Sequence, residues 1–498
     1  MRQASFQTNR LFVNSFAMRK PDWILIIVAV LIHASFLLSL ALHFNVVSVW
    51  PPRVRPEVVI HTLHDNWMPV SPPENQPPAE PQSMSITRRA KGVHLWDRLF
   101  YDSTKYEVGF DFFGLYKGAL DLLRGRSIYQ EARYGQNETV FSDEAVPYYC
   151  PYIYPPIVSY FMVPLAIVLT PFRAFAVWTL VQELLLIWCI VLSRGLFASD
   201  WDKSVVTAMW LCFTPYYLLL YIGQTSFVIA FCIMLLGCSY IAGHKKAGDW
   251  AWIVSVALKL LTLIAAPILV RFKRYRAVIL AIAIVIAASA PYFAFHPQDV
   301  GFFTYLVKSR TVAPYGGDLS HSEVSYYLFG PGAGQQVSKV FMWAVIMLSL
   351  GLTFLPRKVR FVDGLSLWMC TYFLAYIRVW EHHYVMLLPV LVILYARTRS
   401  RLVLALYALI AFFTPFFFLG WSGPVAAGLM LPWTPVRPAW TGLFYHASKP
   451  LPTLLLYGYL MQRIVRRVRR CEIPLLAHHY HCLLYTSDAA DELDGVDL

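Results

Sequence analysis

The segment WILIIVAVLIHASFLLSLALHF, residues 23–44, decides the class of the fold. A bilayer span needs roughly 20 mostly apolar residues, and this segment supplies them without an acid, a lysine or an arginine. Similar segments recur along the chain, so the sequence predicts an all-α polytopic membrane protein with about twelve transmembrane helices. The expected spans are 23–44, 152–171, 174–193, 204–221, 224–243, 250–270, 276–295, 338–356, 363–379, 384–397, 401–420 and 450–463.

The composition agrees with this class. Of the 498 residues, 58% are hydrophobic and only 14% are charged, whereas a soluble chain carries about 25% charged residues. The net charge of +13 then reports on orientation, because Lys and Arg concentrate in cytoplasmic loops. We expect membrane lipids and no nucleic acid as partners, since no soluble domain carries a basic patch.

The N-terminal residues 1–22 are basic and lead into the first span without a small-residue cleavage site. We therefore expect a cytoplasmic N-terminus and a retained anchor rather than a removed signal peptide. The eight cysteines lie mostly inside apolar runs with no CxxC spacing, which is typical of small core residues.

Basic clusters predict the path of the chain. Alternation from an inside N-terminus puts four of them inside: RFKRYR (271–276), RKVR (357–360), RTRSR (397–401) and RIVRRVRR (463–470). The same alternation puts GHKKAGD (243–249) outside. Alternatively this loop lies inside and 250–270 is re-entrant, which Lys259 and Pro267 in its middle permit. We prefer the simple serpentine, in which the transmembrane domain covers 23–463.

Three segments share the outer face in this topology, and we expect a site where they converge. They are the first outer loop 45–151, the second outer loop 297–337 and the turn VWEHHY (379–384). Within the first loop, the Pro-rich stretch 51–91 favours an extended segment to which we assign no chemistry.

The stretch GFDFFGLYKGALDLLRGRSIY (109–129) contains a helical pattern. One stripe holds Phe112, Leu115, Tyr116, Ala119, Leu122 and Leu123, and the other holds Gly114, Lys117, Asp121 and Arg124. This pattern predicts an amphipathic helix over 111–124 that lies flat at the membrane interface. Asp111 stands at its N-terminus, where the helix dipole favours an anion. A plain helix cap in water is the alternative for this residue.

The C-terminal region divides into two parts. Residues 464–481 continue the basic run and are expected to form a cytoplasmic tail. The segment CLLYTSDAADE (482–492) resembles the translation of a sequencing-library adapter, so we leave residues 482–498 out of the functional reasoning.

Five motifs occur in an order that resembles the GT-C membrane glycosyltransferases, and among them glycosyltransferase family 87. They are FDFFGLYKGALDLLRGRSIY (110–129), YIYPPIVSYFMVPLA (152–166), YIGQTSFVIAFCIML (221–235), VALKLLTLIAAPILV (256–270) and VWEHHYVMLLP (379–389). The resemblance covers about 105–400. There are two departures. The 51–91 insertion is longer than expected, and the family's Lys-x-x-Pro reads here as KLLT, with Pro267 eight residues after Lys259.

The resemblance implies transfer of a sugar, with mannose as the first candidate, from a polyprenyl phosphate to a hydroxyl of a lipid-linked or glycolipid acceptor. It implies Asp111 as the base that takes the acceptor proton. A single displacement inverts the anomeric centre, whereas a retaining enzyme needs two closely spaced carboxylates. The implied location is the bacterial inner membrane, with the active site on the outer, periplasmic side.

The carrier phosphate needs hydrogen-bond donors and cations. His382 and His383 are the first candidates, and since adjacent helical side chains point about 100° apart, we expect only one, His383, to face the site. Arg378, Lys308 and Arg310 are further candidates. For the two cations in the second outer loop, contact with lipid headgroups is an equal alternative.

Three further residues are possible supports of the site. Lys259 needs a partner inside a span and could serve structure or substrate. Gln224 could equally make an interhelical hydrogen bond, and Tyr154 precedes two prolines that suit a stiff helix entry. We expect no cofactor and no metal site, because the sequence has no HExxH, no Cys/His quartet and no DxD at Asp111; dependence on a divalent cation stays open at the level of the sequence.

Other classes of function remain open at the level of the sequence. A transporter or flippase of lipid-linked sugars is the main rival, although transporters often show two related halves and no convincing repeat is present here. A glycan ligase or polymerase could share the topology without the ordered motifs. The position of the site separates the first two classes: the outer interface for the enzyme and the midplane for the transporter.

Overall fold

The computed structural model of the protein describes residues 20–48, 108–130, 145–146, 149–301, 318–355, 359–412 and 439–472. These residues form helices and no β-strand, so the all-α prediction is confirmed for this part of the chain. The Pro-rich stretch 51–91 and the tail 473–498 lie outside the described residues, as does most of the second outer loop before Asp318.

In chain order the helices are α2 (Lys20–Ser48), α4 (Phe110–Leu123), α5 (Pro156–Val168), α6 (Pro171–Arg194), α7 (Asp200–Leu211), α8 (Thr214–Ile222), α9 (Ser226–Ile241), α10 (Lys245–Leu258), the 3-10 helix η3 (Leu260–Ala265) and α11 (Ala266–Arg271). They continue with α12 (Tyr275–Phe295), η4 (Pro297–Asp299), α14 (His321–Phe329), α15 (Pro331–Phe354), α16 (Phe361–Ala375), η5 (Glu381–Leu387), α17 (Leu388–Thr398), α18 (Arg401–Ala411), α20 (Ala439–Ala447) and α21 (Pro450–Glu472).

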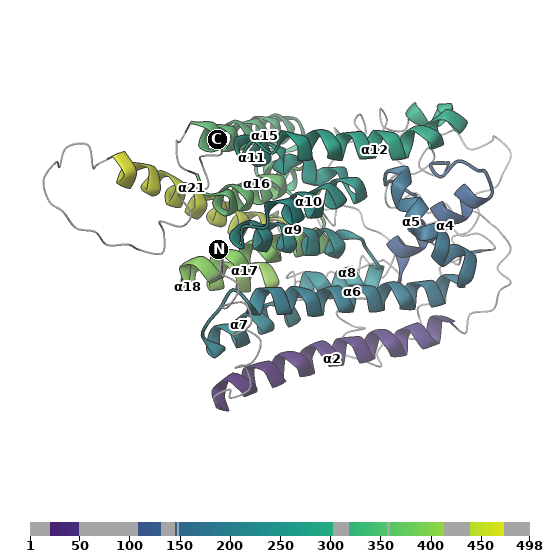
Figure 1. The fold of residues 1–498 in the computed structure, drawn as a ribbon, viewed down its shortest axis with the longest axis horizontal. Helices are drawn as coiled ribbons and strands as arrows, with labels where there is room; N and C mark the ends of the chain where they lie inside the picture. The colour runs from purple at the N-terminus through teal and green to yellow at the C-terminus, as the bar shows by residue number, and fades with distance from the viewer. Residues whose placement is uncertain are drawn as a thin grey trace, which may run out of the picture.

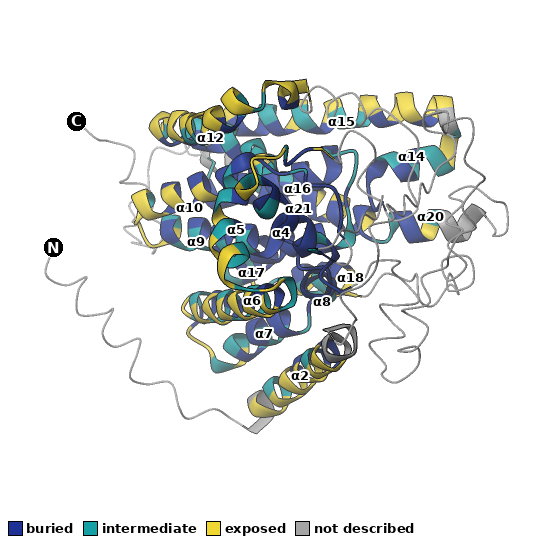
Figure 2. Cartoon of the chain, turned by 90° about the vertical axis from the view of Figure 1, so that its right-hand side faces the viewer, coloured by how far each residue is buried: buried dark blue, intermediate teal, exposed yellow. Residues whose placement is uncertain are grey.

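Five stretches among the described residues are long and apolar enough to cross a bilayer. Four of them, in α2, α6, α12 and α15, lie at the periphery and expose apolar side chains along their outer faces (Figure 2). The fifth runs through α7 and α8, and most of its residues are buried inside the protein. Apolar outer faces of this length indicate an integral membrane protein, because lipid rather than water covers such surfaces favourably.

The basic clusters gather at one end of the bundle, which we call the basic end. There the C-terminal end of α17 contacts the start of α7: Arg399 Nε lies 3.3 Å from Asp202 Oδ2. At the start of α16, Asp363 accepts from Arg463 Nε at 3.2 Å, and Arg467 lies within electrostatic reach of Arg360 and Arg397. The described arginines of these clusters thus lie at one end, in agreement with the predicted sidedness; they are Arg360, Arg397, Arg399, Arg463 and Arg467.

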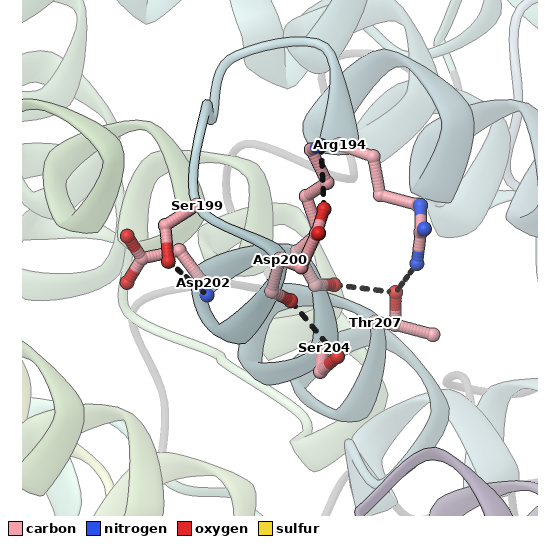
Figure 3. A network of polar contacts seen from close by, with 7 residues as sticks. Arg194, Ser199, Asp200, Asp202, Ser204 and Thr207 are labelled. Atoms are coloured by element: carbon pink, nitrogen blue, oxygen red, sulfur yellow. Dashed lines mark hydrogen bonds and ion pairs between the residues drawn. The ribbon is translucent and has the colours of Figure 1, made fainter. Parts of the chain in front are cut away.

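The turn between α6 and α7 lies at the same end (Figure 1), and Figure 3 shows its polar contacts. Its polar groups bond one another: Arg194 donates to Thr207 Oγ1 at 3.2 Å, and the Ser204 hydroxyl donates to the Asp200 carbonyl at 3.0 Å. Ser199 accepts from the Asp202 N–H at the start of α7. The Ser199 side chain thus satisfies one of the backbone N–H groups that a helix start leaves free.

The segment 250–270 does not cross the bundle. Asp249, at the start of α10, accepts from Arg274 Nε at 2.9 Å, just beyond the end of α11, and from the Tyr240 hydroxyl at 2.7 Å. Both ends of the segment therefore lie at the basic end, with α10 leading in and η3 with α11 leading back. The preferred serpentine is wrong here, and the re-entrant alternative holds, which brings GHKKAGD to the other basic clusters.

The re-entrant hairpin turns at Lys259. Its backbone is extended (φ −153°, ψ 111°) between the end of α10 and the start of η3. The tip is closed by Trp252, whose indole N–H donates to the Thr262 carbonyl at 3.1 Å, and by Ser255, whose hydroxyl donates to Thr262 Oγ1 at 3.1 Å. Side chains of the hairpin thereby satisfy polar groups that the helix break leaves without intrahelical partners.

At the opposite end, which we call the site end, α4 and α5 pack against each other (Figure 1). Tyr116 on α4 donates to the Leu169 carbonyl after α5 at 2.7 Å, while Gly118 faces Ser159 near the start of α5. Because both ends of α5 contact α4, this helix stays at the site end, and the expected span 152–171 does not cross. The count of about twelve spans is not confirmed.

The predicted helix over 111–124 is present as Phe110–Leu123. Its polar stripe is covered, however, since Gly114, Lys117 and Asp121 are all buried. A Cβ at Gly114 would lie 2.5 Å from the Cys150 carbonyl oxygen, so glycine there admits the extended chain before α5. A flat interfacial position of this helix stays a prediction.

Candidate functional site

Asp111 lies in the first turn of α4, where the structure places it next to the end of α8. The helix is capped by Gly109 in the left-handed region (φ 74°), whose N–H donates to the Tyr221 carbonyl at 2.7 Å. Asp111 is therefore not the N-cap residue. Instead its Oδ2 accepts from Gln224 Nε2 at 2.9 Å, which orients the carboxylate.

The environment of Asp111 disfavours its charge. The side chain keeps part of its surface accessible, yet burial of the carboxyl raises its pKa to about 6. Three groups oppose this effect: a hydrogen bond from the Cys150 thiol, the positive charge of Lys259 and the hydrogen bond from Gln224. A carboxylate with a pKa near neutrality can accept a proton and still be ionised when the reaction begins.

Gln224 holds the carboxylate in place. Its Oε1 accepts hydrogen bonds from the Tyr154 hydroxyl and from the Thr225 N–H at 2.8 Å. Both neighbours donate to the oxygen, so the amide nitrogen must face Asp111. The preceding Gly223 adopts φ 74° and its carbonyl accepts from the Trp178 indole at 3.0 Å, which fixes the turn between α8 and α9.

Lys259 is carried to the same place by the tip of the re-entrant hairpin. Its Nζ lies 3.2 Å from Ser226 Oγ and 3.1 Å from His383 Nε2. Its charge also acts on Asp111. The sequence left open whether this lysine serves structure or substrate, and the structure brings it into contact with His383 and within electrostatic reach of Asp111.

His382 and His383 are both buried in η5, with ring centroids 4.5 Å apart in an edge-to-face arrangement. Burial lowers the pKa of both imidazoles well below the usual range, and the nearby Lys259 lowers it further, so both rings are neutral at pH 7. An ammonium can only donate, so His383 Nε2 accepts and the ring proton resides on Nδ1.

Each histidine has one ring nitrogen without a hydrogen-bond partner among the described residues. They are His382 Nε2 and His383 Nδ1. Buried polar atoms without partners are rare in native proteins, and at a functional site they are available to a ligand. Since Nδ1 of His383 carries the proton, this atom offers a donor to an anionic oxygen.

The backbone before η5 is held by the segment 318–319 of the second outer loop. The Leu319 N–H donates to the Val379 carbonyl at 2.7 Å, and the Val379 N–H donates to Asp318 Oδ1 at 2.8 Å. The Tyr384 hydroxyl donates to the Leu319 carbonyl at 3.0 Å. The segment 318–319 and the turn 379–384 therefore meet.

Of the remaining phosphate candidates, the described part of the chain includes Arg378. Arg378 faces the buried acids Asp318 and Glu323, where burial raises the pKa of both carboxyls and the positive charge of Arg378 opposes that rise. Lys308 and Arg310 lie outside the described residues.

Two residues of the site were not predicted. Cys150 was assigned to the core and in fact bonds Asp111, and Ser226 accepts from Lys259. The glycine spacing at 114 and 118 was a signal for the first, because two glycines one helical turn apart admit a close neighbouring chain. Nothing in the sequence pointed to Ser226. Among the described residues, no group of three or more His, Cys, Asp or Glu side chains could hold a metal ion.

Comparison with known proteins gives one match. Residues 152–377 match the model of glycosyltransferase family 87. The matched region is somewhat less than half of the chain and includes Tyr154, Gln224 and Lys259. No curated protein and no solved structure matches the chain. The family match indicates glycosyltransferase activity in general.

Proposed function

We propose that the protein transfers a sugar, with mannose as the first candidate, from a polyprenyl phosphate to a hydroxyl of a lipid-linked or glycolipid acceptor at the outer face of a bacterial inner membrane. The observation that carries the proposal is the group formed by Asp111, Lys259 and His383. It combines a carboxylate of near-neutral pKa, a buried cation and a hydrogen-bond donor without a partner among the described residues.

In the proposed reaction Asp111 accepts the proton of the acceptor hydroxyl while its oxygen bonds the anomeric carbon. The bond between that carbon and the phosphate oxygen breaks, and the electron pair leaves with the phosphate. One base on one side of the sugar is the arrangement of a single displacement, so the product has the inverted anomeric configuration. His383, with His382 beside it, donates hydrogen bonds to the phosphate oxygens.

The position of the group supports a hydrophobic carrier. The group of Asp111, Lys259 and His383 lies at the site end of the bundle, where backbone hydrogen bonds of Gly109 and Gly223 fix the neighbouring turns. The basic end lies opposite, and the positive-inside rule assigns that end to the cytoplasm. A polyprenyl chain is apolar and resides in the bilayer, whereas its phosphate needs polar partners. A site of this kind at the outer end of the spans suits both parts of such a donor.

Purified protein in lipid, radiolabelled polyprenyl-phosphate mannose and a membrane lipid extract test the proposal. We expect label in a glycolipid, and the anomeric configuration of the product, read by NMR, should be inverted relative to the donor. If mannose is not transferred, polyprenyl-phosphate donors that carry glucose or arabinose are tested next. Protein-free vesicles are the control.

Three results would contradict the proposal: no transfer from any of these donors, a product that retains configuration, or label that crosses the bilayer with no new glycosidic bond. The last result would favour the transporter. No described feature favours that reading, since the group lies at one end of the bundle rather than between two related halves.

A further inference from the structure

The re-entrant hairpin brings a single cation to Asp111. Lys259 sits at the hairpin tip, and its extended backbone interrupts what would otherwise be a regular span. A lysine inside an apolar segment costs roughly 2.5–3.5 kcal/mol on insertion scales. A structural bond to Ser226 or His383 could be made by a neutral side chain, so the positive charge itself calls for an explanation.

The charges of the proposed reaction supply one. Before reaction the donor is a phosphodiester with one negative charge, and Asp111 carries another that Lys259 compensates. When the acceptor proton moves to Asp111, the carboxyl becomes neutral. The phosphate leaves as a monoester and gains a second negative charge. The total charge of the site is unchanged, but its negative part moves from the carboxylate to the phosphate.

We infer that Lys259 is a catalytic residue that compensates Asp111 in the resting site and the leaving phosphate during transfer. An ammonium has three donors, and the described residues take two of them, Ser226 Oγ and His383 Nε2. We assign the third to the phosphate of the donor. The inference rests on the proposed function and adds the residue that stabilises the leaving group.

The same contact gives Lys259 a second effect. By occupying His383 Nε2 it fixes the tautomer that offers Nδ1–H to the phosphate. The leaving group thus meets a direct cation and a hydrogen bond that the cation orients. Both contacts strengthen as charge develops on the phosphate, which is the requirement for catalysis rather than uniform binding.

Binding of an isoprenyl phosphate at pH 7.5 tests the inference without turnover, because burial lowers the pKa of Lys259 to about 8 and most of the ammonium is still protonated at this pH. Purified full-length protein in nanodiscs is titrated with citronellyl phosphate, a dianionic monoester at this pH, and with its methyl phosphodiester, a monoanion. We expect wild type to prefer the monoester by about 10- to 100-fold, the range for a hydrogen bond to a charged group. Lys259→Met should remove most of this preference, and Lys259→Arg should keep part of it.

Lys203→Met is the matched control, because Lys203 pairs with Asp200 at the basic end, far from the site; its preference should equal that of wild type. Equal binding of the two ligands by wild type overturns the inference, and this comparison stands even if Lys259→Met does not fold. An unchanged preference in a folded Lys259→Met protein overturns it too.

The outcome for Lys259 is separable from that for the proposed function. Sugar transfer by wild type together with equal binding of both ligands would support the proposed transferase activity and contradict the role of Lys259 in stabilising the leaving phosphate. A preference for the monoester that depends on Lys259, without transfer from any donor, would support phosphate binding by Lys259 and contradict the proposed transferase activity.

Discussion

At the scale of single residues, the account depends on the ionisation of Asp111. Burial raises its pKa to about 6, so the carboxyl is protonated below that pH and cannot accept a proton. We expect kcat/KM for transfer to rise as the pH increases through about 6, and to fall again through about 8, where Lys259 loses its proton because burial lowers its pKa. The groups that act on Asp111 are Cys150, Gln224 and Lys259.

A pH profile of wild type with a saturating acceptor measures this dependence. The donor phosphodiester does not titrate in this range, so the rising limb belongs to the enzyme. A rate that is flat or falls between pH 5 and pH 7 would contradict the assignment of Asp111 as the base.

The tautomer of His383 gives a second prediction at the same scale. The amide nitrogen of Asn falls near the position of Nδ1, and that of Gln falls near the position of Nε2. Because Lys259 occupies Nε2, the donor to phosphate is Nδ1. We therefore expect His383→Asn to keep a measurable part of the transfer rate and His383→Gln to lose at least about tenfold more, equal to about 1.4 kcal/mol. Comparable rates of the two variants would contradict the tautomer.

At the scale of elements, the turn between α8 and α9 depends on Gly223. A Cβ at this residue would lie 2.5 Å from Phe112 Cβ, and its φ is 74°. Gly223→Ala should lose about 1–3 kcal/mol of stability through overpacking and should lower the transfer rate further, because Gln224 would move away from Asp111. Thermal unfolding and the transfer assay measure the two effects.

Gly243→Ala is the matched control. Gly243 also has a positive φ of 79° but meets no atom within 4 Å, so this variant carries the backbone strain without the clash. Its transfer rate should stay close to that of wild type. An equal loss of transfer in both variants would show that backbone strain alone, rather than the position of Gln224, explains the effect.

The helix over Phe110–Leu123 was predictable because its apolar spacing is local. The path of 250–270 was not predicted correctly, since length and hydropathy describe a span equally well whether it crosses or returns. The information that decided it is the contact between Asp249 and Arg274, which joins residues 25 apart in sequence. Charge counting had already flagged the inconsistency at 243–249.

At the scale of the whole molecule, the re-entrant hairpin predicts a labelling pattern. Lys246 and Arg276 are exposed at the basic end, and Arg124 is exposed at the site end. Single cysteines at these positions, in a cysteine-free background, are treated with an impermeant maleimide in right-side-out and inverted vesicles. Lys246→Cys and Arg276→Cys should react from the same side and Arg124→Cys from the other. Reaction of the first two from opposite sides would restore the serpentine.

The convergence of the site was predictable in part. Asp111, Tyr154, Gln224, Lys259 and the histidine pair come from the five motifs, and the described structure connects them through hydrogen bonds and charge. The partners within the group could not be derived, because a sequence does not show which of two adjacent histidines meets a lysine 124 residues away. Arg378 was assigned to phosphate from its proximity in sequence, and the structure places it beside two acids.

The most direct test of the central claim is the initial rate of sugar transfer by Asp111→Asn, with Asp363→Asn as the control. Asp363 is a buried carboxyl that pairs with Arg463 and Arg467 at the basic end. A general base contributes about 10²- to 10⁴-fold, so Asp111→Asn should fall by that factor while a folded Asp363→Asn stays near wild type. Transfer by Asp111→Asn at the wild-type rate would contradict the account.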